Sequence, residues 1–210
     1  MLQFLREKIS KRISGWAHRH LSFGGRLTLI RSTLEAIPIH LFQAIEPTKT
    51  ALHCLEQQLA CFFWGATNEK KKTPWIGWEQ ICLSTAEGGL GIRRFEEVLR
   101  AFSIKLWWRF REQNSLWATH IYSKYCSKKS PMTAHSSGCN SSTWRRLTKA
   151  WPHANPNIRW IIGDGKVLFW DDIWLGERPL REVVLDTRGN PRSRVLDFWS
   201  EGTGTLRNCH

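Results

Sequence analysis

Three aspartates in the last quarter of the chain are the residues whose type could support catalysis. Asp164, Asp171 and Asp172 could together hold two divalent metal ions, as the carboxylates of metal-dependent nucleases do. Asp164, however, lies between two glycines, a context in which aspartate forms a tight turn. Asp171 and Asp172 are adjacent, and no further carboxylate motif accompanies them. A turn is therefore the preferred explanation of Asp164, and a nuclease stays an alternative.

The six cysteines do not form a recognisable zinc site or disulfide framework. None belongs to a C-x-x-C pair, and neither His53-Cys54 nor Cys209-His210 has a second ligand pair at zinc spacing. Cys54 and Cys61 would lie about 10 Å apart along a helix, too far for a disulfide. Serine-hydrolase, zinc-protease, phosphate-loop and dinucleotide motifs are also absent from the sequence. We therefore expect reduced cysteines and no cofactor in this chain.

The charge distribution points to binding rather than catalysis. The chain carries 31 Lys and Arg against 18 Asp and Glu, a net charge of +13. Residues 1–31 and 93–130 each have a net charge of +6, whereas residues 167–210 have a net charge of −1. Two separate basic regions favour a nucleic acid partner over a basic surface without a ligand. The 13 tryptophans could serve a core or stack on bases.

The first basic region is expected to lie on two helices. In residues 2–16 the apolar residues recur at helical spacing and leave four cations on the remaining surface: Arg6, Lys8, Lys11 and Arg12. The second helix is opened by Gly24 and Gly25, and Arg26 and Arg31 flank its apolar face. That face holds Leu27, Ile30, Leu34 and Ile37. Pro38 predicts an end or a kink near Ile37, and this pattern alone fits an ordinary core helix.

The rest of the chain is expected to be helical up to a β-hairpin near its end. Pro47 and Gly65 are placed to begin and end one helix. Apolar periodicity predicts further helices over residues 93–112, 116–125 and 144–151. The Asp164-Gly165 dipeptide between two apolar, β-prone runs predicts a hairpin over residues 158–170.

The predicted helix over residues 93–112 has a side on which arginine and tryptophan alternate. Arg93, Arg100, Trp107 and Arg111 share this side, away from the apolar stripe. Such a side could contact phosphates and stack on bases. Arginine stems lying over a half-buried tryptophan would give the same pattern, so both interpretations stay open.

The sequence also indicates where the protein is expected to reside. No secretory signal is evident, and no apolar run approaches the roughly 18 residues of a membrane span. We therefore expect an intracellular protein, in the nucleus or the cytoplasm.

Several short blocks, taken in order, resemble the reverse transcriptases of plant non-LTR, LINE-like retrotransposons. Each block is weak alone, and their shared order over roughly residues 5–200 carries the resemblance. The blocks are Ile13-Ser14-Gly15-Trp16, residues 21–30, Ile37-Pro38-Ile39-His40, Phe62-Phe63-Trp64-Gly65, Trp78, residues 87–92, residues 106–110, residues 115–118, and Gly163-Asp164-Gly165-Lys166 with Phe169-Trp170 and Trp174-Leu175-Gly176.

The resemblance implies a mainly α fold: a thumb-like helical bundle, a helical connector and a small C-terminal part containing the β-hairpin. The thumb of this family grips the template–primer duplex. The implied division is a thumb-like region over residues 1–66, a post-thumb connector over 67–126, a linker over 127–142, a short helix plus hairpin leading toward a zinc-binding segment over 143–200, and a frayed tail over 201–210.

The sequence lacks the motifs that hold the catalytic and metal-binding residues of the family. It lacks the Tyr-x-Asp-Asp motif whose aspartates bind the catalytic magnesium in longer relatives, and it lacks the zinc-segment ligands and ribonuclease H carboxylates. We therefore expect a fragment or truncated element remnant without polymerase activity of its own.

The resulting hypothesis is non-catalytic binding of RNA or an RNA–DNA duplex through backbone phosphates. The candidate contacts are Lys11, Arg12, Arg19, Arg26 and Arg31, with Arg100, Trp107 and Arg111 as a second group. No membrane partner is expected; the palm and ribonuclease H regions of a full-length protein would be further partners. The alternative is a basic structural or interaction module, or a degenerate remnant with no activity.

Overall fold

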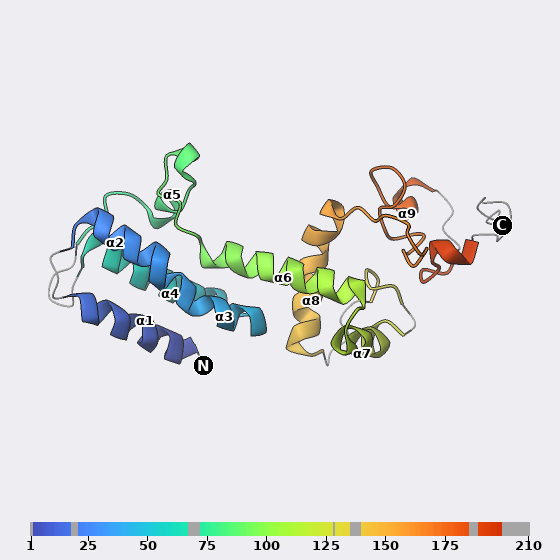
Figure 1. Ribbon diagram of the computed structural model, residues 1–210, viewed down its shortest axis with the longest axis horizontal. Helices are drawn as coiled ribbons and strands as arrows, with labels where there is room; N and C mark the ends of the chain where they lie inside the picture. Colours follow the sequence, from blue (N-terminus) through green and yellow to red (C-terminus); the bar gives the residue numbers. More distant parts are fainter. Residues whose placement is uncertain are drawn as a thin grey trace. The chain divides into compact units, whose positions relative to one another are not determined.

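The computed structural model describes residues 2–17, 21–66, 72–127, 129–134, 140–184 and 189–198. The chain divides into two compact units, Met1–Phe102 and Ser103–His210, and the division falls within one long helix (Figure 1). The described residues are mainly helical, which confirms the predicted mainly α class.

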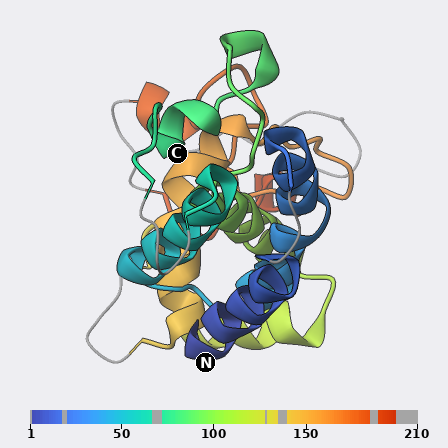
Figure 2. The ribbon, with the colours of Figure 1, turned by 90° about the vertical axis from the view of Figure 1, so that its left-hand side faces the viewer.

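Unit 1 is built on three helical rods that pack side by side (Figure 2). The first rod is α1, and the second joins α2, the π-helix η1 and α3 end to end; the third is α4. Two short helices, α5 and the 3-10 helix η2, then precede α6. Their bounds are α1 Leu2–Ala17, α2 Phe23–Leu29, η1 Ile30–Leu34, α3 Ala36–Ala44, α4 Lys49–Trp64, α5 Trp78–Ile81, η2 Thr85–Glu87 and α6 Phe95–Glu112.

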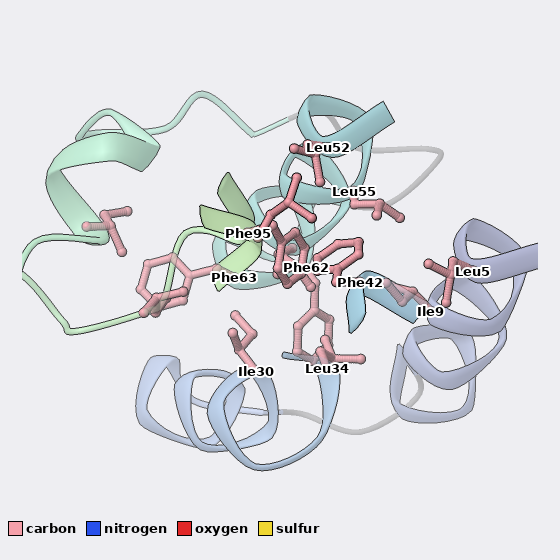
Figure 3. Packing of buried hydrophobic residues seen from close by; sticks show 14 of the residues in the cluster. Leu5, Ile9, Ile30, Leu34, Phe42, Leu52, Leu55, Phe62, Phe63 and Phe95 are labelled. Atoms are coloured by element: carbon pink, nitrogen blue, oxygen red, sulfur yellow. The ribbon is translucent and has the colours of Figure 1, made fainter. Parts of the chain in front are cut away.

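The core of unit 1 lies between these rods, and each rod contributes apolar side chains that point toward the others (Figure 3). Phe42 of α3 meets Phe95 of α6 edge-on, with ring centroids 5.6 Å apart. Burial of these faces stabilises the bundle through removal of apolar surface from water. The labelled members of the cluster are Leu5, Ile9, Ile30, Leu34, Phe42, Leu52, Leu55, Phe62, Phe63 and Phe95.

The second rod contains a π-helical turn that the sequence analysis did not predict. The Glu35 N–H donates to the Ile30 carbonyl at 3.0 Å, which is the i→i+5 bond of a π-helix. Ile30 and Leu34 are fully buried as expected. Beyond the π turn, the buried positions are Pro38 and Phe42. Of the predicted end or kink near Ile37, the end is not formed, because Pro38 lies in the first turn of α3, where its missing N–H is tolerated. A kink stays a prediction.

Helix α4 has well-defined ends. Thr48 caps its N-terminus by accepting a hydrogen bond from the Ala51 N–H at 3.3 Å, so the helix begins at Lys49 rather than at Pro47. Gly65 ends it in the left-handed conformation with φ of 67°, which confirms the prediction made for this glycine.

In unit 2 the C-terminal part of α6 packs with α7 and α8 around an aromatic core. Trp107, Phe110 and Trp144 are fully buried there, and Tyr125 stacks on Trp144 at a centroid distance of 4.5 Å. Ser141 caps α8 by accepting a hydrogen bond from the Trp144 N–H. The remaining elements are α7 Leu116–Tyr125, α8 Ser142–Ala154, η3 Asn155–Asn157, α9 Leu180–Val183 and η4 Val195–Phe198.

The described part of the predicted linker over residues 127–142 has exposed ends, at Ser127 and Ser141, and a buried middle. Ser130, Met132 and Ala134 are all buried. Met132 and Ala134 pack in the same apolar cluster as Trp107 and Trp144, which fixes this segment to unit 2. Its serine- and lysine-rich composition concealed these two apolar anchors.

The β-hairpin predicted over residues 158–170 is not formed. The turn itself is present, because the Gly165 N–H donates to the Ile162 carbonyl at 2.9 Å. Residues 167–169, however, pair with residues 193–195 rather than with the other arm of the turn. The described ranges contain the isolated antiparallel bridge Leu168–Arg194 and no strand. The bonds beside this bridge run from Phe169 N–H to Ser193 at 2.8 Å and from Val195 N–H to Val167 at 3.0 Å.

The four cysteines within the described ranges are free thiols. Burial raises the pKa of Cys82 and of Cys126 to about 12, whereas Cys61 is exposed. Because only the thiolate reacts with alkylating agents, we expect Cys61 to be alkylated well before Cys82 and Cys126 in the folded protein at pH 8. Mass spectrometry of iodoacetamide-treated protein checks this order, and fast modification of Cys126 without unfolding would contradict it.

None of the helices that the structure describes combines the length and the apolar character needed to cross a bilayer.

Candidate nucleic-acid interface

The exposed side of α1 presents the clearest group of unengaged cations. Leu5 and Ile9 turn one face of the helix into the unit 1 core. Lys8, Lys11 and Arg12 lie along one edge of that face and are exposed to solvent. The helical repeat alone positions them, since residues three and four apart share a side of a helix.

The same side of α1 lines an open hollow of about 740 Å³. Phe4 contributes an aromatic ring to this hollow and is 64% exposed. Its described lining carries three cations and one carboxylate, that of Glu7. The described residues of the lining are Phe4, Glu7, Lys8, Lys11, Arg12, Gly15 and Trp16.

The lysine and arginine side chains of this surface have no ion-pair partner among the described residues. The ion pairs of unit 1 are formed instead by Arg94 with Glu79 and Glu96. Lys8, Lys11 and Arg12 are therefore available to an anionic ligand without first breaking an internal contact. We call these three residues the α1 cationic surface.

Arg26 has a structural contact that the sequence analysis did not predict. Its Nη1 donates to the Phe63 carbonyl at 3.3 Å, and its guanidinium lies 5.8 Å from the centroid of the Phe23 ring. The guanidinium also packs directly against Gly65. A side chain at that position would collide with it, since a Cβ there would lie 2.6 Å from the Arg26 Cζ. The guanidinium thus sits at the C-terminus of α4, where a cation is favourable. Substituting Arg26 would change the fold as well as any phosphate contact.

The other predicted contacts of the first group are placed differently. Arg31 is exposed on the π-helical turn, and its Nη2 lies beside Gly91. Arg19 lies outside the described residues. The structure therefore brings Lys11 and Arg12 together with Lys8, which the hypothesis had not included among its contacts. The buried positions Leu5 and Ile9 could have signalled Lys8, because helical spacing places it at the edge of the apolar face, where its side chain can reach solvent.

The arginine–tryptophan side predicted on α6 is corrected for two of its three proposed contacts. Arg100 is exposed, but Trp107 is 0% exposed and cannot stack on a base. Arg111 is 5% exposed and forms a bidentate ion pair with Asp172, at 2.7 and 2.8 Å. Its guanidinium also lies over the rings of Trp107 and Trp160. Arginine and tryptophan do pack together here, but inside unit 2.

The three aspartates considered as metal ligands are engaged by cations. Asp172 accepts hydrogen bonds from Arg111 and from the Leu168 N–H, and Asp171 pairs with Arg181 at 2.6 Å. Asp164 pairs with Lys166 at 3.0 Å on the exposed turn. Over the described ranges, no group of three or more His, Cys, Asp or Glu could hold a metal ion. The nuclease alternative thus has no metal site among these residues.

An exposed group of aromatic rings also escaped the sequence analysis. Phe23, Trp64 and Trp75 come from three separate segments of unit 1, and their ring centroids are 6.0 to 6.3 Å apart. Trp75 is 84% exposed and Phe23 is 48% exposed. Trp75 belongs to the connector over 67–126 that the resemblance implied, and no local pattern around it indicates that it would meet the other two rings.

Comparisons with known proteins find two relatives in Arabidopsis thaliana. The chain is 36% identical, over 205 residues and 94% of its length, to a protein named "Putative ribonuclease H protein". It is 26% identical, over 149 residues and 69% of its length, to an uncharacterized mitochondrial protein, 97% of which is covered. The chain spans 33% of the length of the first relative. No family model and no solved structure matches the chain.

Proposed function

We propose that the chain is a plant retroelement-derived protein that binds nucleic acid without catalysing a reaction on it. The name of the first relative refers to ribonuclease H, an activity of retroelement proteins, and the match extends over 94% of this chain. The ordered blocks that resemble plant LINE-like reverse transcriptases support a thumb-like role for residues 1–66, which belong to unit 1. The proposed ligand is RNA or an RNA–DNA duplex, and the palm and ribonuclease H regions of a longer protein are proposed partners.

The α1 cationic surface is the observation that carries this proposal. Lys8, Lys11 and Arg12 are exposed, lie on one side of one helix and have no described carboxylate partner. Lysine and arginine side chains with this freedom bind backbone phosphates and release counterions from the nucleic acid. Phosphate contacts position a ligand without reading its sequence. We therefore propose weak sequence preference and strong dependence on salt.

A charge-reversal experiment tests the proposal. The variant Lys8→Glu/Lys11→Glu/Arg12→Glu is expected to bind a labelled RNA–DNA hybrid more weakly than wild type. The slope of log affinity against log salt should fall by about two to three, roughly one for each lost phosphate contact. Fluorescence anisotropy over a salt series measures both quantities.

A matched variant controls for the change in net charge. Lys129→Glu/Arg145→Glu/Arg178→Glu reverses three exposed cations of unit 2, and circular dichroism verifies the helical content of both variants. Equal losses in the two variants would show a non-specific charge effect rather than a surface on α1. A folded wild-type protein that does not bind at low salt would overturn the proposed function.

A further inference from the structure

The aromatic group of Phe23, Trp64 and Trp75 is held as a structured surface, here called the aromatic platform. Phe23 is the first residue of α2, Trp64 is the last residue of α4, and Trp75 lies in the segment after the undescribed residues 67–71. Trp64 is 9% exposed and supports the two outer rings. Trp75 lies 6.1 Å from Trp64 and 6.3 Å from Phe23, so two rings contact one side of it.

The exposure of Trp75 is unusual for a residue with this much apolar surface. Tryptophan buries a large area when a core accepts it, yet this ring is 84% exposed while it rests on two others. The ring is thus positioned by the fold but leaves most of its surface to solvent. A planar ligand could stack on that free surface without displacing a protein group.

The charges around the aromatic platform favour an anionic ligand. The Arg26 guanidinium lies 5.8 Å from the Phe23 ring centroid, and Arg31 and Lys72 belong to the same segments. The described parts of these segments, residues 21–34, 59–66 and 72–78, contain no Asp or Glu. A ligand that joins flat rings to negative charges matches this combination better than an apolar protein segment does.

We propose that the aromatic platform stacks an unpaired base of single-stranded nucleic acid, with Trp75 as the principal contact. This inference rests on the proposed function, because it assumes that the chain binds nucleic acid. It adds that the aromatic platform binds single-stranded rather than duplex nucleic acid. Stacking of bases on aromatic rings is tolerant of sequence, since every base has a π face. Arg26, whose guanidinium lies beside the Phe23 ring, would contact a phosphate next to the stacked base.

The test compares two labelled single-stranded oligonucleotides of equal length and charge. One is a twelve-residue oligothymidylate, and the other has the same backbone with abasic residues throughout. Wild type is expected to bind the oligothymidylate more tightly. Trp75→Leu should weaken that binding about 5- to 150-fold, the range that base stacking supplies, and should leave binding of the abasic strand unchanged.

Two further variants sharpen the comparison. Trp75→Phe keeps an aromatic face and should recover most of the affinity for the oligothymidylate. Ile161→Ala removes an exposed apolar side chain from unit 2, where Ile161 is 92% exposed, and should change neither affinity. The comparison of the two strands with wild type alone needs no variant. Equal binding of both strands would contradict base stacking even if Trp75→Leu does not fold.

Each outcome separates this inference from the proposed function. If wild type binds both strands equally and Trp75→Leu has no effect, the base-stacking inference fails while phosphate binding stands; a protein partner for the aromatic platform would give the same result. If wild type is folded and binds neither strand nor the RNA–DNA hybrid, the proposed function fails, and base stacking fails with it.

Discussion

Replacing Asp172 with alanine is expected to lower the free energy of unfolding by about 3–5 kcal/mol, the usual effect of removing one partner of a buried ion pair. The Asp172 side chain is 0% exposed, and that of Arg111 is 5% exposed. Without the carboxylate, the Arg111 guanidinium would stay buried with an uncompensated charge. The Leu168 N–H, which donates to Asp172 at 2.9 Å, would lose its acceptor as well.

Urea unfolding followed by circular dichroism measures this loss. The double variant Arg111→Met/Asp172→Ala removes both charges and should recover much of the stability, although the Leu168 N–H stays unpaired. Asp164→Ala is the matched control, because its ion pair with Lys166 is exposed on both sides and such pairs contribute about 0–1 kcal/mol. Similar losses in Asp172→Ala and Asp164→Ala would contradict a structural role for the buried pair.

Replacing Trp107 with alanine is expected to cost about 3–5 kcal/mol of unfolding free energy, because the variant leaves a cavity in the core of unit 2. Trp107 is fully buried and packs on Phe110 at a centroid distance of 5.5 Å. Its Nε1 is buried without a hydrogen-bond partner among the described residues. Packing is therefore the contribution that Trp107→Ala removes, and Trp107→Phe should cost considerably less.

The same variant separates packing from nucleic-acid contact. At a temperature where Trp107→Ala is still folded, its affinity for the oligothymidylate should equal that of wild type, in contrast to Trp75→Leu. Arg100→Ala, an exposed substitution on the same helix, should change stability by no more than about 0.5 kcal/mol. A folded Trp107→Ala protein with weakened binding would show that the buried ring has a role in recognition.

Local patterns in the sequence predicted most of the helices, because their information lies within a few turns. Leu5 and Ile9 mark the buried face of α1, and Gly65 marks the end of α4. The hairpin prediction failed for the opposite reason: the partner of residues 167–169 lies at residues 193–195, beyond any local pattern. A strong turn dipeptide specifies a reversal of the chain but does not specify which segment pairs with its arms.

The candidate site was predictable only in part. The cations of α1 follow from helical periodicity, since Lys8, Lys11 and Arg12 occupy one exposed side that adjoins the apolar face. Two contacts join residues that are far apart in the sequence and belong to no recognisable motif. They are the hydrogen bond of Arg26 to Phe63 and the buried ion pair of Arg111 with Asp172. The same limit applies to Trp75, whose ring meets Phe23 only after α2 and α4 have packed.

The π-helical turn over Ile30–Leu34 has a consequence for how this chain can change in evolution. Ile30, Leu34, Pro38 and Phe42 are all buried at intervals of four residues, whereas four residues of a regular α-helix overshoot one turn by about 40°. The wider π turn compensates for part of this drift. Deleting a single residue there would convert the π turn into a regular α-helical turn. Pro38 and Phe42 would then lie seven and eleven residues after Ile30, close to whole numbers of α-helical turns, and would stay on its face. In-frame loss of one codon in this stretch should therefore be better tolerated than loss of one codon in the middle of α4, where the deletion would rotate every later residue by about 100°.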